Sequence, residues 1–183
     1  MNIPNVLSLL RIFMVAPFLI AVIYRQFTLA LVIFVISGIS DFLDGYLARR
    51  LGQTSVLGTF LDPLGDKLLT TVAFISLCFQ GLLPPWLAVT VVAKDLYIVI
   101  GSGILYFSGN FSVAVPSIWG KLSTFLQIIA VCVALSSALW SIGAELLNGL
   151  YTVTGMITVI AFFHYIWCGV KVFSENTNGD EQP

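Results

Sequence analysis

The chain has 183 residues and a mass of 19.9 kDa, and it is 58% apolar but only 9% charged, with a mean hydropathy of +1.01. Soluble domains carry about 25% charged residues, and a small domain leaves much of its surface in water, so this composition excludes a water-soluble globule, a disordered chain and a coiled coil. It leaves an integral membrane protein. The net charge of −1 and the lack of any basic run argue against nucleic acid as a partner.

Six stretches are long and apolar enough to cross a bilayer as helices, since one crossing needs about 20 residues. They run from Ile3 to Tyr24, Phe27 to Ala48, Gly58 to Phe79, Trp86 to Phe107, Trp119 to Trp140 and Leu147 to Val170. Turn-forming or charged residues separate them. We therefore expect an all-α bundle of six transmembrane helices that forms one domain over residues 1–174, with a frayed polar tail at 175–183.

The cations predict the orientation of these helices. Arg49, Arg50, Lys121 and Lys171 fall on one side of the membrane, and only Arg25 falls on the other. Positively charged residues favour the cytoplasmic side. Both termini are therefore expected in the cytoplasm, as an even number of crossings requires, and we predict a protein of the bacterial inner membrane.

Four aspartates gather where the second span ends and the third begins. Their spacing places them on two helical stripes: Asp41, Asp44, Gly45 and Ala48 at i, i+3, i+4 and i+7, then Gly58, Asp62 and Asp66 at i, i+4 and i+8. The short connection makes the two helices antiparallel neighbours, so we expect the stripes to face each other near the cytoplasmic surface. A charge at the centre of a membrane helix costs about 2.5–3.5 kcal/mol, so the cluster needs a function or a counter-charge.

Divalent cations would relieve the repulsion among four facing carboxylates. Oxygen ligands alone favour Mg²⁺ or Mn²⁺, and two ions about 3.5–4 Å apart form the clamp that is used in phosphoryl chemistry. The stripes therefore predict a substrate that carries a phosphate or pyrophosphate group and is reached from the cytoplasm. An ion-coupled transporter is the alternative from another class, because carboxylates inside a membrane also mark ion pathways. The sequence lacks the repeats that many transporters show.

The pattern Asp41-x₂-Asp44-Gly45-x₂-Ala48-Arg49-x₈-Gly58-x₃-Asp62-x₃-Asp66 resembles the complete signature of the CDP-alcohol phosphotransferases, with every fixed position and every gap in agreement. The resemblance extends over nearly the whole chain. It implies a homodimer that transfers a phosphatidyl group from CDP-diacylglycerol to an alcohol and releases CMP.

The resemblance also implies residue roles. Asp41, Asp44 and Asp62 would hold a first metal ion, and Asp41, Asp62 and Asp66 a second. Asp66 would in addition be the general base that removes the proton of the acceptor hydroxyl. Contacts to the CDP-lipid are implied for Asn5, Gly45, Ala48, Arg49, Ser55 and Gly58.

The acceptor alcohol is less clearly indicated. Trp119-Gly120-Lys121-x₂-Thr124-x₂-Gln127 resembles the Gly-Lys-x-Lys-Thr-x₂-Gln stretch of phosphatidylglycerophosphate synthases, whose acceptor is glycerol 3-phosphate. Ser123 stands where the second lysine of that stretch is usual. Asp95, where that branch has a glutamate after an arginine, resembles the eukaryotic-type cardiolipin synthases, whose acceptor is phosphatidylglycerol. We expect glycerol 3-phosphate, with phosphatidylglycerol as the alternative.

Three cations are the candidates for binding an anionic acceptor. Lys94, Lys121 and Arg11 would together neutralise a phosphate dianion, which needs at least two such groups in a membrane. For Lys94 a second interpretation stays open, in which it and Asp95 neutralise each other, or its ammonium group extends along the helix to reach polar surroundings.

Overall fold

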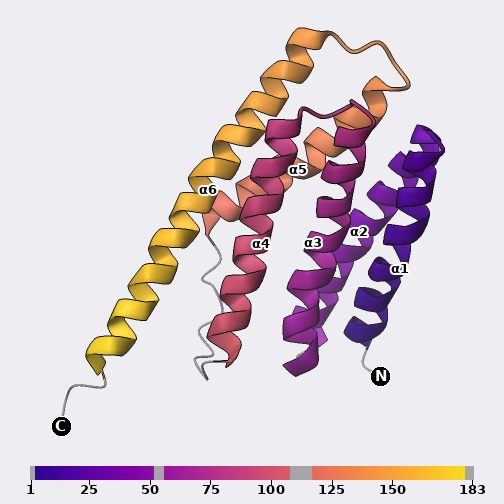
Figure 1. Cartoon of the computed structure of the whole chain (residues 1–183). Helices are drawn as coiled ribbons and strands as arrows, with labels where there is room; N and C mark the ends of the chain where they lie inside the picture. The colour runs from indigo at the N-terminus through magenta and orange to yellow at the C-terminus, as the bar shows by residue number, and fades with distance from the viewer. Residues whose placement is uncertain (1–2, 52–55, 108–116, 180–183) are drawn as a thin grey trace.

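The computed structural model is all-α. It describes the backbone of residues 3–51, 56–107 and 117–179, and the side chains of residues 12–40, 67–101, 103 and 117–169. The helices are α1 (Ile3–Ile23), α2 (Phe27–Leu51), α3 (Val56–Phe79), α4 (Pro85–Phe107), α5 (Ile118–Ser137) and α6 (Ala144–Gly179). Figure 1 shows a bundle in which successive helices alternate in direction, so that both chain termini lie at the same end. This end is called the terminal end below.

The six helices match the six predicted spans, with shifts at their ends. α5 stops at Ser137, three residues before the predicted Trp140, and α2 continues to Leu51. The largest difference is α6, which remains helical as far as Gly179, nine residues beyond the predicted end of the sixth span at Val170. Once a helix has formed, each further residue adds a backbone hydrogen bond at little cost, even where the sequence becomes polar.

Tight turns close the bundle at the end opposite the termini. After α3, the N–H of Gly81 donates to the carbonyl of Cys78 at 3.0 Å and that of Leu82 donates to Leu77 at 2.9 Å, which is the Schellman arrangement. The arrangement needs a left-handed residue, and Gly81 has φ 74°. Arg25 has φ 57° at the corresponding place after α1. Both turns therefore reverse the chain within a few residues and keep consecutive helices antiparallel.

An apolar core joins all six helices. α1 packs against α2 and α3, α5 packs against α2, α3 and α6, and α4 packs against α3 and α6. The fully buried side chains alternate between large and small residues, as close helix packing in a membrane requires. The core contains Phe18, Ala21 and Val22 of α1, Ala30 and Phe34 of α2, Leu69, Ala73, Phe74 and Leu77 of α3, Leu87 and Val91 of α4, Ala130, Val131, Ala134 and Leu135 of α5, and Tyr151 of α6.

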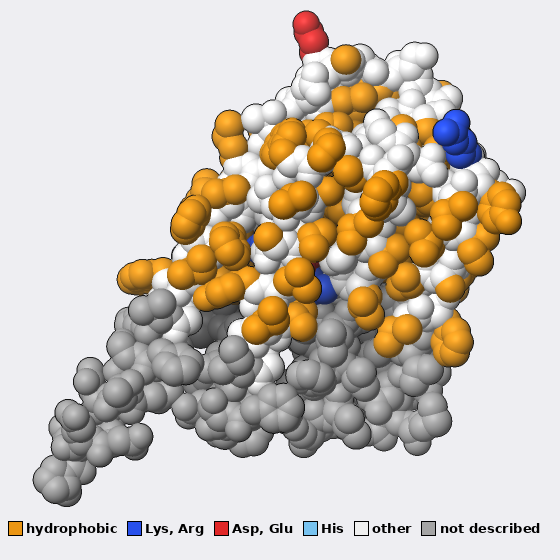
Figure 2. Space-filling model, viewed as in Figure 1, with side chains coloured by type: hydrophobic (Ala, Val, Ile, Leu, Met, Phe, Trp, Pro, Cys, Tyr) orange, Lys and Arg blue, Asp and Glu red, His pale blue; other side chains and the backbone are white. Residues whose placement is uncertain are grey.

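The outer surface of the described part is also apolar. Large hydrophobic side chains from every helix are exposed, among them Phe79 at 87%, Val89 at 68% and Trp167 at 66%. Figure 2 shows such side chains spread over the visible face with few charges between them. Within the described residues, two helical segments, Ile118–Ser137 and Ala144–Gly169, are long and apolar enough to cross a membrane by length and composition. A bundle that is apolar both inside and outside is suited to a lipid environment.

Gly155 allows α6 to approach α4 closely. A Cβ atom at this position would overlap the indole ring of Trp86, whereas a Cβ at Gly149, two turns earlier on α6, would meet nothing within 4 Å. We predict that Gly155→Ala lowers the free energy of unfolding by about 1–3 kcal/mol through overpacking. The control Gly149→Ala should leave it unchanged or raise it by up to about 1 kcal/mol, because alanine favours helix. Unfolding in mixed detergent micelles measures both, and equal stability of the two variants would contradict the packing role of Gly155.

Candidate functional site

The predicted metal-binding aspartates lie on two consecutive helices at the terminal end. Asp41 and Asp44 belong to α2, and Asp62 and Asp66 to α3. α2 ends at Leu51 and α3 begins five residues later, so the two helix ends lie within about 18 Å of each other, the reach of a fully extended chain. The aspartate side chains are outside the described part of the structure. Their mutual geometry therefore stays a prediction.

Several other predicted site residues also lie outside the described side chains. This holds for Asn5, Arg11, Gly45, Ala48, Arg49 and Gly58, whose helical backbone is described, and for Ser55, which falls in the connection between α2 and α3. Their implied contacts to the CDP-lipid or the acceptor stay predictions. The side chains of residues 12–40, 67–101, 103 and 117–169 form no group of three or more His, Cys, Asp or Glu that would hold a metal ion.

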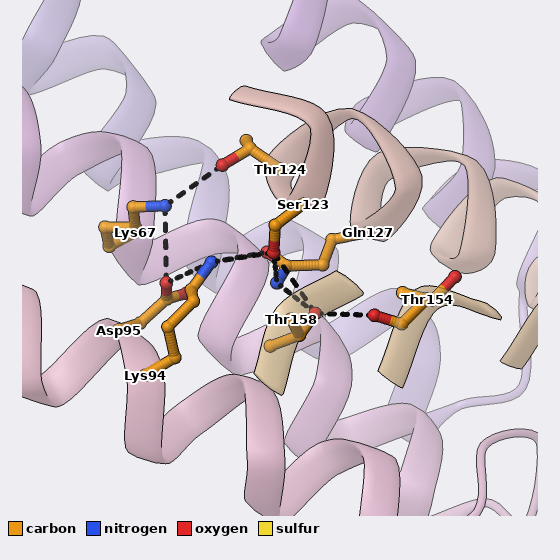
Figure 3. Close-up of polar contacts among 8 residues, drawn as sticks. All are labelled: Lys67, Lys94, Asp95, Ser123, Thr124, Gln127, Thr154 and Thr158. Carbon is orange, nitrogen blue, oxygen red and sulfur yellow. Dashed lines mark hydrogen bonds and ion pairs between the residues drawn. The ribbon is translucent and has the colours of Figure 1, made fainter. Parts of the chain in front are cut away.

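The described residues contain a buried polar cluster between α3, α4, α5 and α6. Figure 3 shows Lys67, Lys94, Asp95, Ser123, Thr124, Gln127, Thr154 and Thr158 converging from these four helices. We call this group the lysine cluster. At its centre the Lys94 side chain is only 1% exposed and that of Asp95 2%. Because charges buried among apolar helices are costly unless they are paired, the partners of these groups decide whether the cluster is tolerated.

The ammonium group of Lys94 has three polar neighbours inside the protein. Its Nζ lies 3.1 Å from Asp95 Oδ1, 3.3 Å from Ser123 Oγ and 3.4 Å from Gln127 Oε1. Lys94 and Asp95 thus form the neutralising pair that was one of the two interpretations of the sequence. Two hydrogen bonds and one ion pair thus hold the ammonium group of Lys94 inside the bundle.

The polar side chains next to Lys94 are ordered by their own hydrogen bonds. Gln127 Nε2 donates to Ser123 Oγ at 3.0 Å and to Thr158 Oγ1 at 3.2 Å. The hydroxyl of Thr158 donates to the carbonyl of Thr154 at 2.7 Å, so in the 3.1 Å contact between Ser123 and Thr158 the serine is the donor. Each N–H or O–H group in this series of hydrogen bonds has one acceptor. The series holds Lys94 in one position and joins α4, α5 and α6.

Lys67 was not among the predicted site residues, and the structure brings it to the edge of the cluster. Its Nζ lies 3.3 Å from Asp95 Oδ1 and 3.4 Å from Thr124 Oγ1. Asp95 Oδ1 thus faces two ammonium groups, one from α3 and one from its own helix. Unlike Lys94, the Lys67 side chain is 19% exposed. The sequence signal that could have identified Lys67 is its position directly after Asp66, inside an apolar span.

The lysine cluster lies on the terminal-end side of the apolar core in every helix that contributes to it. On α3, which runs away from the terminal end, Lys67 precedes the core residues that begin at Leu69. On α4, which runs in the opposite direction, Lys94 follows the last core residue, Val91. The antiparallel order therefore gathers the polar residues into one layer. This layer is continuous in sequence with the aspartate end of α3, since Lys67 follows Asp66.

The start of α5 carries the predicted Gly120-Lys121 pair. Gly120 is buried, and a Cβ there would overlap the hydroxyl of Tyr165 on α6, so this glycine is needed for helix packing. Lys121 is exposed, and it lies one turn before Thr124, on the side of α5 that contacts Lys67. The structure thus places Lys121 near the edge of the lysine cluster and outside its buried centre.

The fold and the lysine cluster together define a class of protein. A helical bundle that is apolar inside and out, with two lysines around a buried carboxylate on the side of the terminal end, is a membrane protein with a charged site at one end. Residues 1–167 match the family model of CDP-alcohol phosphatidyltransferase, and the chain belongs to this family. The family and the long apolar helices make it an integral membrane protein. Enzymes of this family are generally metal-dependent.

Curated relatives carry two different names at similar identity. A Drosophila melanogaster protein named "Probable cardiolipin synthase (CMP-forming)" is 34% identical over 91% of this chain and 57% of its own length. The Bacillus subtilis "CDP-diacylglycerol--glycerol-3-phosphate 3-phosphatidyltransferase" is 29% identical over 96% of this chain and 95% of its own. A Mycobacterium tuberculosis "Probable phosphatidylglycerophosphate synthase" is 36% identical over 71% of this chain and 64% of its own. The chain thus spans less than two thirds of the length of the Drosophila and mycobacterial relatives.

Removal of Lys94 should destabilise the bundle. Lys94→Met leaves Gln127 Oε1 without its donor, removes one of the two donors to Ser123 Oγ and leaves half of the Asp95 pairing unmade. We therefore expect a loss on the order of 3 kcal/mol in the free energy of unfolding. Thr152→Ala is the control, because the Thr152 hydroxyl is exposed and bonds only to the carbonyl of Asn148 at 2.8 Å. Chemical unfolding in bicelles compares the two variants. Equal stability of Lys94→Met and wild type would show that the cluster does not hold the helices together.

Proposed function

We propose that the protein transfers the phosphatidyl group of CDP-diacylglycerol to glycerol 3-phosphate, forming phosphatidylglycerophosphate and CMP in phospholipid biosynthesis. Family membership supports the reaction class, and the complete aspartate signature supports the donor. The observation that carries the acceptor is the pair of lysines, Lys67 and Lys94, that meet at one carboxylate next to the aspartate end of α3. Together with the exposed Lys121, they give the region two net positive charges, which suit a phosphate dianion.

In the proposed reaction the acceptor hydroxyl oxygen attacks the lipid-side phosphorus of the CDP diester. A new phosphorus–oxygen bond forms, the bond to CMP breaks, and Asp66 takes the proton of the hydroxyl. Asp41, Asp44, Asp62 and Asp66 form an all-carboxylate donor set that fits two hard cations, Mg²⁺ or Mn²⁺. Such ions, when bound, neutralise the diphosphate and the departing CMP.

The substrates meet these residues at the terminal end of the bundle. We place this end in the cytoplasm, with six membrane-spanning helices and both termini on that side, because most of the cations lie there. The CDP-lipid keeps its acyl chains beside the apolar helix faces and presents its nucleotide to Asn5, Gly45, Ala48, Arg49, Ser55 and Gly58. The exposed apolar surface also agrees with a homodimer in the membrane.

Phosphatidylglycerol is the second candidate acceptor, and two observations favour it. Asp95 neutralises one positive charge of the lysine cluster. Ser123 stands where the Gly-Lys-x-Lys-Thr stretch has its second lysine, and it is buried, hydrogen-bonded and uncharged. A phosphodiester carries a single negative charge and needs fewer cations than a phosphate monoester. The names of the relatives include cardiolipin synthases as well as glycerol 3-phosphate transferases.

Release of CMP distinguishes the two acceptors. Purified protein is incubated with CDP-diacylglycerol, Mg²⁺ and one acceptor at a time. We expect CMP and a phosphatidylglycerophosphate product with glycerol 3-phosphate, and much less CMP with phosphatidylglycerol. The reverse result would identify a cardiolipin synthase, and a lack of CMP with any alcohol would leave an ion-coupled transporter as the remaining interpretation.

Asp66 is tested by a substitution that keeps the shape of the side chain. We predict that Asp66→Asn lowers the rate of CMP release by about 10²–10⁴-fold, the usual contribution of a general base. Glu145→Gln is the control, because Glu145 is an exposed acid in the first turn of α6, at the opposite end of the bundle. Binding of Mn²⁺, followed by electron paramagnetic resonance, is measured in parallel. Near wild-type transfer by Asp66→Asn with metal still bound would refute the assigned role.

A further inference from the structure

The lysine cluster contains one lysine that is buried and one that is partly exposed. Lys94 makes two hydrogen bonds and one ion pair inside the protein and is only 1% exposed. Lys67 has two partners among the described residues, Asp95 and Thr124, and is 19% exposed. Because its side chain is partly exposed, the Lys67 ammonium group is the one of the two that a molecule outside the cluster can reach. A ligand that approaches from the aspartate end therefore meets Lys67 and not Lys94.

Asp95 holds Lys67 in this position and limits the charge around it. The carboxylate is 2% exposed, and its Oδ1 pairs with both lysines. Neither of its buried oxygens has a hydrogen-bond partner among the described residues, so both lysine contacts are ion pairs. Two cations and one anion leave one net positive charge in the buried group. Because charges interact strongly in a medium that excludes water, a change of one unit here alters how well an anion is bound beside Lys67.

We propose that Asp95 determines the charge preference for the acceptor: it holds Lys67 beside the acceptor's phosphate and restricts the buried group to a single excess positive charge. Asp95 acts through Lys67 and is a positioning residue. Lys67, the partly exposed lysine, is the cation that contacts the phosphate oxygen. The inference rests on the proposed phosphatidyl transfer and assigns specific roles to Lys67 and Asp95, neither of which belongs to the aspartate signature or to the predicted acceptor-binding set.

The test uses variants that change the net charge of the cluster in both directions. Asp95→Asn adds one positive charge, Lys67→Gln removes one, and the double variant restores the wild-type value. For each variant, kcat/KM is measured with glycerol 3-phosphate, a dianion, and with phosphatidylglycerol, a monoanion. The quantity compared is the ratio of the two constants relative to wild type, so the different lipid character of the acceptors cancels. Glu145→Gln is the matched control for the loss of an acid, since it lies at the far end of the bundle.

We expect Asp95→Asn to raise the ratio in favour of glycerol 3-phosphate by about tenfold and Lys67→Gln to lower it by about tenfold, the effect of one hydrogen bond to a charged group. The double variant should lie between the two single variants, because it restores the net charge but lacks the Lys67 contact, and Glu145→Gln should not change the ratio. A merely structural role would lower both constants together and leave the ratio unchanged, and that result would overturn the inference.

Failure of the inference is distinguishable from failure of the proposed function. If wild-type protein releases no CMP with either acceptor, the phosphatidyl transfer itself is wrong. If wild type is active and the ratio does not follow the charge, only the role of Asp95 is wrong. Should Asp95→Asn fail to fold, Lys67→Gln tests the opposite shift on its own, because Lys67 is at the edge of the cluster, and Lys67→Arg, which keeps the charge, should retain the wild-type ratio.

Discussion

The buried carboxylate of Asp95, shared by two lysines, is the interaction on which the polar part of this bundle depends. Three charges are placed among helices that are otherwise apolar on every side, and such charges are tolerated only when they are paired and hydrogen-bonded. Asp95 pairs with Lys94 on its own helix and with Lys67 on α3. Ser123 and Gln127 complete the coordination of Lys94. Four helices are thereby joined at one depth, directly beside the end that carries the signature aspartates.

The apolar core and the lysine cluster have complementary roles. The core, from Phe18 to Tyr151, occupies the end of the bundle where tight turns at Arg25 and Gly81 reverse the chain. It supplies close packing without burying any charged group. The cluster lies between this core and the helix ends that carry the aspartates, so closely packed helices hold the residues next to the charged site in place. A chemical group placed on such a support keeps its position when substrate binds, which is the requirement for oriented catalysis.

Most of the architecture could be predicted from the sequence. Six apolar stretches gave six helices, since a run of about 20 apolar residues has few alternatives in a membrane. The family followed from the spacing of Asp41 to Asp66, and the match over residues 1–167 agrees with it. The sequence also raised the pairing of Lys94 with Asp95 as one of two interpretations. The end of α6 was predicted too early, because polarity after Val170 does not by itself stop a helix that runs on to Gly179.

The amino-acid sequence by itself determined the membrane environment, the helix number and the signature of the reaction, because these depend on local composition and on spacing along one helix. The tertiary structure alone decided that Lys94 is buried within the cluster and that Lys67 is partly exposed at its edge. Lys67, Lys94 and Ser123 belong to three different helices, and spacing within a helix carries no information on the distances between helices. Only the packing of α3, α4 and α5 brings the two ammonium groups to one carboxylate, and that contact distinguishes a buried structural lysine from an accessible one.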